Sequence, residues 1–280
     1  MNRKFRLAFI AAAAISLASC GGGSSTSSGS SDTETDASTP IEAVELSFQP
    51  IAAGKLTVCS DVPYEPFEYQ DEQGNWTGFD MDLMKDIAAR YGLALEVKKT
   101  AFDTILVAVN AGECDVVASS VTITEERAKN VLFSDAYFDA DQSLLVRKED
   151  AETLIDLDAL KGKTVAVQSG TTGEIYAKEN ITDSTTKIQS FEDASAMFLA
   201  LESKQVDAVL QDFPINAFRA VKQGTSQVTG RFTTNEKYGF AVALTNEDLR
   251  TAINESLNEF NAQGIYDEVF AKYFGDPNAE

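Results

Sequence analysis

The sequence predicts an α/β fold with mostly parallel sheets, and three observations support this prediction. Four short apolar runs each end in polar residues; they span residues 56–59, 116–118, 165–167 and 206–210. Continuous Val, Leu and Ala runs of this length are typical of strands buried on both faces of a parallel sheet. Helix-like segments alternate with these runs, and the same strand–helix order occurs twice along the chain. We therefore predict two similar α/β units with a cleft between them.

The first 41 residues are expected to lie outside this fold. A basic start precedes the apolar stretch 7–17, which is shorter than the ~20 residues that a membrane span needs. Residues 1–19 therefore resemble a secretory signal peptide. The sequence Leu-Ala-Ser-Cys that ends at Cys20 is similar to a bacterial lipobox, in which the cysteine carries a diacylglycerol. The alternative is an ordinary signal peptide that happens to hold a cysteine.

Residues 20–41 are mostly Gly, Ser, Thr and Asp and bury almost nothing, so they predict a flexible tether. With a lipid on Cys20, the protein would be extracytoplasmic and anchored to the membrane without crossing it.

Composition excludes several classes of function. The 280 residues include 23 basic and 44 acidic side chains, a formal net charge of −21, which disfavours nucleic acid as a partner. There is no histidine, so triads that need an imidazole are impossible, and no metal or cofactor site is indicated. Besides Cys20 the chain holds only Cys59 and Cys114. If these lie on neighbouring parallel strands, their offset of five residues is too large for a disulfide, and free buried thiols are favoured over a bridge.

The first unit begins with a strand over 55–60 and a turn over 71–75. A helix then follows, with Asp80 expected as its N-cap and Gly92 as its C-terminal stop. A further strand, helix and strand lead to Ser120.

The second unit restarts at Lys163 with the same order. The residues around Ala108–Val117 and Ala200–Val209 resemble each other at a constant offset, which is weak evidence for duplication. The chain ends in a helix over about 246–261 and a second helical piece ending near 273–275. In the first of these, apolar residues at helical spacing predict core positions: Leu249, Ile253, Leu257 and Phe260.

Polar residues at the strand ends predict the site, because ligands of such sheets bind beyond the carboxyl ends of the strands. Arg127 lies in the first turn of a short helix that Thr124 caps, where a cation is unfavourable unless it holds an anion. The glycine turn over 168–174 offers backbone N–H groups to an anion, and it lacks the features of a nucleotide-binding loop. Asp212, at another strand end, is suited to an ammonium group. An arginine for a carboxylate and an aspartate for an amine together describe a site for a free amino acid.

Several motifs also resemble a known family. In chain order they are Asp61-x-x-Tyr64-x-Pro66-Phe67, Gly78-Phe79-Asp80-x-Asp82-Leu83, the run from Ser119 to Arg127, Gln168-Ser169-Gly170-Thr171-Thr172, and Gln211-Asp212. They are similar to family 3 of the bacterial extracellular solute-binding proteins, the polar amino acid receptors of ABC importers, over about residues 52–276.

The resemblance implies the two-lobed type II periplasmic-binding-protein (Venus flytrap) fold, each lobe a mixed, mostly parallel sheet with flanking helices. Residues 50–138 and 239–276 would form lobe 1, and 142–234 would form lobe 2. Crossover strands near 137–141 and 234–238 would serve as hinges.

The resemblance also implies roles for individual residues. Arg127 would bind the ligand carboxylate, with help from Ser120, Thr122, Thr171 and Thr172. Asp212 would take the α-ammonium, while Tyr64 and Phe102 flank the side chain and Asp61 reaches its polar end. Ser119 and Ser120 with Asp61 resemble the binders of basic amino acids, whereas Gln168 equally suits a neutral polar ligand, so both ligand classes stay open.

The expected protein is thus a monomeric amino acid receptor that closes on its ligand and presents it to an ABC permease, and not an enzyme. Two rivals stay open: an exported enzyme similar to cyclohexadienyl dehydratase, and a sensory lipoprotein with the same cleft.

Overall fold

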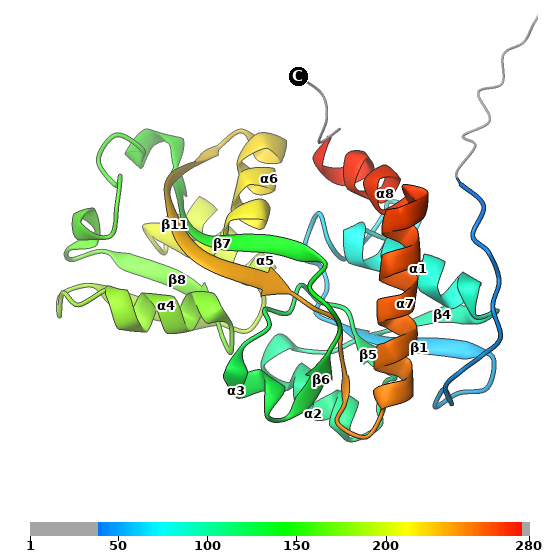
Figure 1. The fold of residues 1–280 in the computed structure, drawn as a ribbon. Helices are drawn as coiled ribbons and strands as arrows, with labels where there is room; N and C mark the ends of the chain where they lie inside the picture. Colours follow the sequence, from blue (N-terminus) through cyan, green and yellow to red (C-terminus); the bar gives the residue numbers. More distant parts are fainter. Residues whose placement is uncertain (1–38, 276–280) are drawn as a thin grey trace, which may run out of the picture. The chain divides into compact units, whose positions relative to one another are not determined.

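The computed structural model describes residues 39–275 of the chain. The predicted signal peptide, Cys20 and most of the predicted tether lie outside the described residues. Figure 1 shows the fold, which contains two five-stranded sheets and one small hairpin. In the described part of the chain, no helix is both long and apolar enough to cross a membrane.

The first sheet has the strand order β4-β1-β5-β12-β6. Its strands are β1 (Lys55–Ser60), β4 (Ala94–Lys99), β5 (Val116–Val117), β6 (Val131–Phe133) and β12 (Ala241–Ala243). β1 pairs in parallel with β4 and β5, whereas β12 is antiparallel to both of its neighbours. The hairpin of β2 (Tyr69–Gln70) and β3 (Trp76–Thr77) encloses the predicted turn, where the Asp71 carboxylate accepts from the N–H groups of Gln73 and Asn75.

Alternate residues of the first sheet pack against helices on opposite faces. Val58 and Val116 join the core formed with α1 (Phe79–Arg90), α7 (Glu247–Gln263) and α8 (Ile265–Phe274). Cys59 and Val117 face a second core with α2 (Ile105–Asn110). Burial on both faces accounts for the unbroken apolar runs that predicted these strands.

The second sheet has the order β11-β7-β10-β8-β9. Its strands are β7 (Phe138–Arg147), β8 (Thr164–Gln168), β9 (Lys187–Phe191), β10 (Ala208–Asp212) and β11 (Ser226–Tyr238). β8 is parallel to β9 and β10, and β7 is antiparallel to β10 and β11. α4 (Thr172–Asn180) packs on one face, and α5 (Ala194–Glu202) and α6 (Phe213–Gln223) pack on the other. The remaining short helices are η1 (Phe102–Thr104), α3 (Glu125–Ala128), η2 (Lys148–Asp150) and η3 (Asp158–Leu160).

The chain passes between the two sheets twice, from β6 to β7 and from β11 back to β12. The α/β class and the two mixed sheets are confirmed, although the pairings in each sheet are half parallel and half antiparallel. The predicted lobe boundaries and hinges stay predictions.

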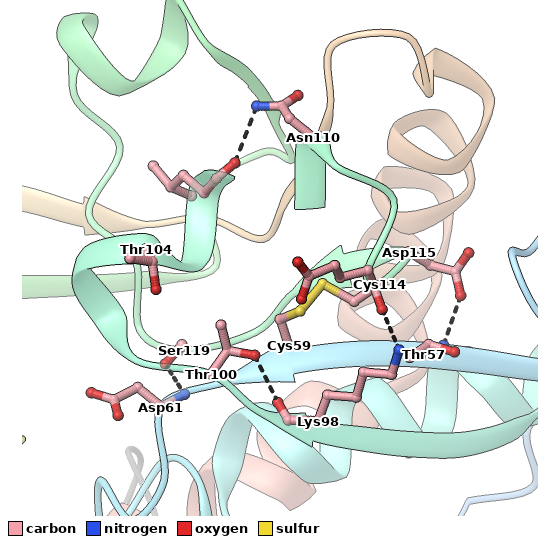
Figure 2. The surroundings of a disulfide bond; sticks show 12 residues. Thr57, Cys59, Asp61, Lys98, Thr100, Thr104, Asn110, Cys114, Asp115 and Ser119 are labelled. Atoms are coloured by element: carbon pink, nitrogen blue, oxygen red, sulfur yellow. Dashed lines mark hydrogen bonds between the residues drawn. A yellow bond between two sulfur atoms is a disulfide. The ribbon is translucent and has the colours of Figure 1, made fainter. Parts of the chain in front are cut away.

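Cys59 and Cys114 form a disulfide with their Cα atoms 5.7 Å apart, so the expectation of free thiols is wrong (Figure 2). That expectation placed Cys114 within a strand beside β1. Cys59 instead pairs with Val117 in the sheet, and Cys114 lies before β5, in the turn that follows α2. A residue in a turn is not fixed to the spacing of the sheet, so Cys114 can approach Cys59 closely.

The expectation that Asp80 caps its helix is also wrong. α1 begins after Gly78 and has no side-chain cap, and Asp80 is buried within its first turn. The carboxylate of Asp80 accepts hydrogen bonds from the Ser120 N–H and the Tyr137 hydroxyl. The predicted cap Thr124 is confirmed, because it accepts from the N–H of Arg127. Asn246, which was expected only to begin its helix, accepts from the N–H of Leu249 in the same way.

Candidate functional site

The first wall of the candidate site is formed by loops that follow β1 and β5. These strands are parallel neighbours, so their carboxyl ends bring Asp61 and Ser119 together. The Ser119 hydroxyl accepts from the Asp61 N–H at 2.9 Å, as Figure 2 shows, and donates to the Glu68 carboxylate at 3.0 Å. Ser120 has a φ of 49°, which is uncommon for a residue other than glycine. The conformation directs its N–H to Asp80 and its hydroxyl to Glu68.

The second wall comes from the ends of β8 and β10. Gln168 is the last residue of β8, and Thr171 caps α4 by accepting from the Glu174 N–H. Asp212 ends β10 immediately before α6. The two walls meet where the Gln168 side-chain amide donates to the Asp61 carboxylate at 2.5 Å, and where the Tyr64 hydroxyl donates to Asp212 at 3.4 Å.

Ten of the eleven predicted ligand-binding residues line one cavity between these walls. The lining residues are Asp61, Tyr64, Glu68, Phe102, Ser119, Ser120, Thr122, Gln168, Thr171, Thr172 and Asp212. The volume of this cavity is about 10 Å³, which is room for about one water molecule. A small polar ligand therefore requires the walls to separate before it can enter.

Arg127, the eleventh predicted residue, lies at the edge of this cavity. Its guanidinium lies over the Phe102 ring at 5.3 Å from the ring centre. It donates to the carbonyl of Thr122 at 2.8 Å and to the carbonyl of Gly170 at 3.0 Å, and so contacts both walls. Burial lowers the pKa of Arg127, and the charges of Asp212 and Glu236 oppose this effect. The guanidinium keeps further N–H donors for an anion.

Asp212 is buried and held by three donors. One carboxylate oxygen accepts from the Gln142 amide at 2.6 Å, and the other accepts from the Tyr238 and Tyr64 hydroxyls. Burial raises the pKa of Asp212 to about 6, and the charge of Glu236 adds to the rise. The charge of Arg127 acts in the opposite direction.

Two more carboxyl groups next to the site have raised pKa values. Burial raises the pKa of Asp61 to about 6, although the hydrogen bond from Gln168 partly offsets this. Burial and the charge of Asp80 raise the pKa of Glu68, a fully buried neighbour. Residues 39–275 contain no group of three or more acidic, cysteine or histidine side chains arranged to hold a metal ion.

A larger cavity of about 760 Å³ lies on the second sheet, beside α5, α6 and the ends of β7 and β11. None of the predicted site residues lines it, and three of its four basic residues, Arg147, Lys204 and Arg219, are ion-paired to neighbouring acids. Size alone would favour this cavity, but the converging charges and hydroxyls lie in the smaller one between the walls.

Comparison with known proteins agrees with this geometry. The family model described as bacterial extracellular solute-binding proteins, family 3, matches residues 56–276. The chain belongs to this family. A probable histidine-binding protein of Neisseria gonorrhoeae is 32% identical over 277 residues, which cover 97% of this chain and 96% of that protein.

Solved structures of similar proteins confirm the fold of this solute-binding protein. An ancestral arginine-binding protein bound to arginine is 38% identical with a TM-score of 0.75, covering 79% of this chain and 99% of that one. An ancestral amino acid-binding protein, AncCDT-1, described as a precursor of cyclohexadienyl dehydratase, is 37% identical with a TM-score of 0.74, covering 79% and 96%. The predicted two-lobed type II fold is therefore confirmed.

Four polar residues of this solute-binding protein's site were not predicted from the sequence. Glu68 lines the cavity, and Gln142, Glu236 and Tyr238 contact its residues from β7 and β11. Each is a single polar residue in a strand or loop with no motif around it. The one available signal was that Glu68 directly follows the motif residues Pro66 and Phe67.

Proposed function

We propose that the protein is an extracytoplasmic receptor for a polar or basic L-amino acid, and that it delivers this ligand to an ABC importer. The observation that carries the proposal is the pair of opposite charges at one cavity, Arg127 at its edge and Asp212 in its wall. A free amino acid carries a carboxylate and an ammonium at a fixed short separation, which these two groups complement.

The proposed roles follow the chemistry of each side chain. Arg127 binds the α-carboxylate through its free N–H donors, and Asp212 binds the α-ammonium. Tyr64 and Phe102 enclose the start of the ligand side chain, and Asp61 with Gln168 faces its polar end. Five further lining residues supply hydroxyls: Ser119, Ser120, Thr122, Thr171 and Thr172.

Ligand capture is proposed to proceed by hinge closure. The two segments that join the sheets, near 137–141 and 234–238, would bend so that the lobes separate and close again. The small free space between the walls supports this, because an amino acid fits only if the lobes move apart. A ligand that contacts both walls then favours the closed form, which the permease would recognise.

The side chain of the ligand is proposed to be polar or cationic. Asp61 accepts a hydrogen bond from Gln168 and has no cationic partner among the residues that line the cavity. A cationic ligand would supply that partner, and the names of the relatives, histidine-binding and arginine-binding, support the same class. A neutral ligand would instead hydrogen-bond to both Asp61 and Gln168.

The N-terminal features support an anchored receptor. We propose that residues 1–19 are removed, that Cys20 carries the lipid, and that residues up to 41 tether a monomeric binding domain to the membrane. Labelling of the protein with a radioactive fatty acid, lost in Cys20→Ala, tests this assignment.

Calorimetric titration of the purified protein against the twenty amino acids, ornithine and cystine tests the receptor function. We expect one-to-one binding of one or a few ligands with a dissociation constant of about 1 µM, near −8 kcal/mol.

Arg127→Ala should weaken this binding by at least about 100-fold, because a buried charged pair is lost. Arg250→Ala is the matched control, since Arg250 pairs with Glu247 on α7. An Arg127→Ala protein that is folded and binds as tightly as wild type would contradict the assignment.

The second candidate function is a dehydratase. It is favoured by the structural neighbour described as a precursor of cyclohexadienyl dehydratase, and by carboxyl groups with pKa values near 6 in the cavity. Such groups can exchange protons near neutral pH. Incubation with prephenate separates the two functions, because the receptor assignment predicts no turnover. A sensory role would share amino acid binding but require no permease.

A further inference from the structure

Glu236 brings together side chains from both walls of the site. One of its carboxylate oxygens accepts from the Thr122 hydroxyl at 2.9 Å and from the Thr172 hydroxyl at 2.5 Å. The other accepts from the Gln142 side-chain amide at 3.0 Å. Thr122 follows β5, whereas Thr172 opens α4, so one carboxylate joins segments that belong to different sheets.

The position of Glu236 depends on the irregular end of β11. The pairing of β11 with β7 shifts register between Phe232 and Glu236. Asn235, within this shift, has a φ of 54°. After the shift, successive side chains of β11 again point to opposite faces of the strand, with Lys237 exposed and Tyr238 buried. Glu236 and Tyr238 therefore share the face of β11 that is directed toward Asp212 and the cavity.

These hydrogen bonds fix the direction of two hydroxyl groups. A threonine hydroxyl has a single hydrogen, and an ionised carboxylate can only accept. With both hydrogens directed to Glu236, the oxygens of Thr122 and Thr172 offer only lone pairs to the cavity. Asp212, which Gln142 links to Glu236, is likewise an acceptor. The two hydroxyl oxygens lie 3.3 Å apart, and the Gln142 amide that donates to Asp212 also lies 3.4 Å from the Thr172 oxygen. This part of the cavity therefore presents three neighbouring acceptors.

We infer that Glu236 is a positioning residue that orients Thr122 and Thr172 so that the site selects ligands with a primary ammonium group. An ammonium has three donors and no acceptor, which matches the two hydroxyl oxygens and Asp212. The inference rests on the proposed function and refines it. The two hydroxyls then serve the ammonium and not the carboxylate, to which the family resemblance assigned them, and Arg127 with backbone N–H groups holds the carboxylate.

The test compares ligands that differ only in the α-ammonium. The probes are L-arginine with 5-guanidinopentanoic acid, and L-histidine with 3-(imidazol-4-yl)propanoic acid. If the amino acid panel selects another ligand, that ligand and its deamino acid form the pair. Calorimetry gives the ratio of the two affinities for wild type, Glu236→Gln and Glu247→Gln. Glu247→Gln is the matched control, because it makes the same change at an exposed position on α7, outside the cavity and the proposed hinges.

In Glu236→Gln we expect the preference for the amino acid over its deamino analogue to fall at least about tenfold, the effect of hydrogen bonds to a charged group. Affinity for the deamino analogue should hold or improve, and the ratio in Glu247→Gln should match wild type. In a Thr122→Val background the same substitution should change the ratio less, because Glu236 acts through that hydroxyl.

Two results would overturn the inference. An equal loss for both members of a pair would show that Glu236 supports only the fold, and an unchanged ratio would show that it does not orient the hydroxyls. If the wild-type protein binds no amino acid of the panel, the proposed function fails as well, and that failure is visible before any variant is made.

Discussion

At the scale of single residues, we expect Asp212 to couple ligand binding to pH. Its carboxyl is buried, and its pKa of about 6 lies above the ordinary value of 3.8. The carboxyl is therefore ionised at neutral pH but becomes protonated in mildly acidic solution. A protonated carboxyl cannot balance the charge of an ammonium in a buried site. The group proposed to hold the ligand amine is thus the one whose charge changes within an accessible range.

We predict that affinity decreases as the pH falls below about 6, by up to about tenfold per pH unit. With arginine as the ligand, both the ammonium and the guanidinium keep their charge throughout this range, so the change comes from the protein. Calorimetry between pH 7.5 and 4.5 measures the slope, and Asp212→Asn should bind weakly with a much flatter profile. Protonation of Asp61 should weaken binding further only if the ligand side chain is cationic, because only then does the charge of Asp61 contribute to binding. A wild-type affinity that stays constant down to pH 4.5 would contradict this role of Asp212.

The same pKa shift has the opposite effect on folding. Between about pH 4 and 6 the folded protein binds the proton of Asp212 more tightly than the unfolded chain does. The free energy of unfolding without ligand therefore falls as the pH rises through this range. Acid thus stabilises the fold through Asp212 while it weakens ligand binding.

At the scale of secondary-structure elements, Gly78 holds the start of α1 against the site. It has a φ of 121°, and a Cβ built on it would lie 2.2 Å from the carbonyl oxygen of Phe67. Phe67 directly precedes Glu68, which lines the cavity. The close approach of these two backbone segments therefore needs a residue without a side chain.

We predict that Gly78→Ala lowers the free energy of unfolding by more than about 3 kcal/mol, because both strain and a backbone clash arise. Gly74→Ala is the matched control. Gly74 also has a positive φ, of 82°, but no atom lies within 4 Å of its Cβ position. The control should cost only about 1–2 kcal/mol, the strain alone. Urea unfolding measures both values, and equal losses would show that the approach to Phe67 is not tight.

Regular elements could be predicted because their signals are local. The strand at 55–60 depends on an apolar run, and the cap Thr124 depends on a side chain three residues from an N–H group. The disulfide could not be predicted, because it depends on how the turn at Cys114 folds over β1. Asp80 matches the pattern of a cap, yet it bonds to Ser120 and Tyr137, which are distant in sequence.

At the scale of the whole molecule, the site is assembled from both sheets and from the strands that lead between them. Motifs at strand ends predicted the residues of each wall, since each motif is continuous in sequence. Glu236 and Gln142 carry no motif, and their contacts exist only because β7 and β11 run side by side past the cavity. Residues of this kind can be assigned to the site only when the register of the two strands is known.

Because the ligand-binding groups are divided between the two sheets, binding should be coupled to a change in the separation of the lobes. The two walls already contact each other, through Gln168 and Asp61, through Tyr64 and Asp212, and through the bonds of Arg127 to Thr122 and Gly170. A ligand that pairs with Arg127 and Asp212 adds further contacts across the same cleft.

We therefore predict that saturating ligand lowers the radius of gyration measured by small-angle X-ray scattering. Arg127→Ala should show no such decrease at the same ligand concentration, and Arg250→Ala should respond like wild type. Tight binding by calorimetry without any change in wild-type scattering would show that the ligand enters without closure, and the hinge assignment at 137–141 and 234–238 would then fail.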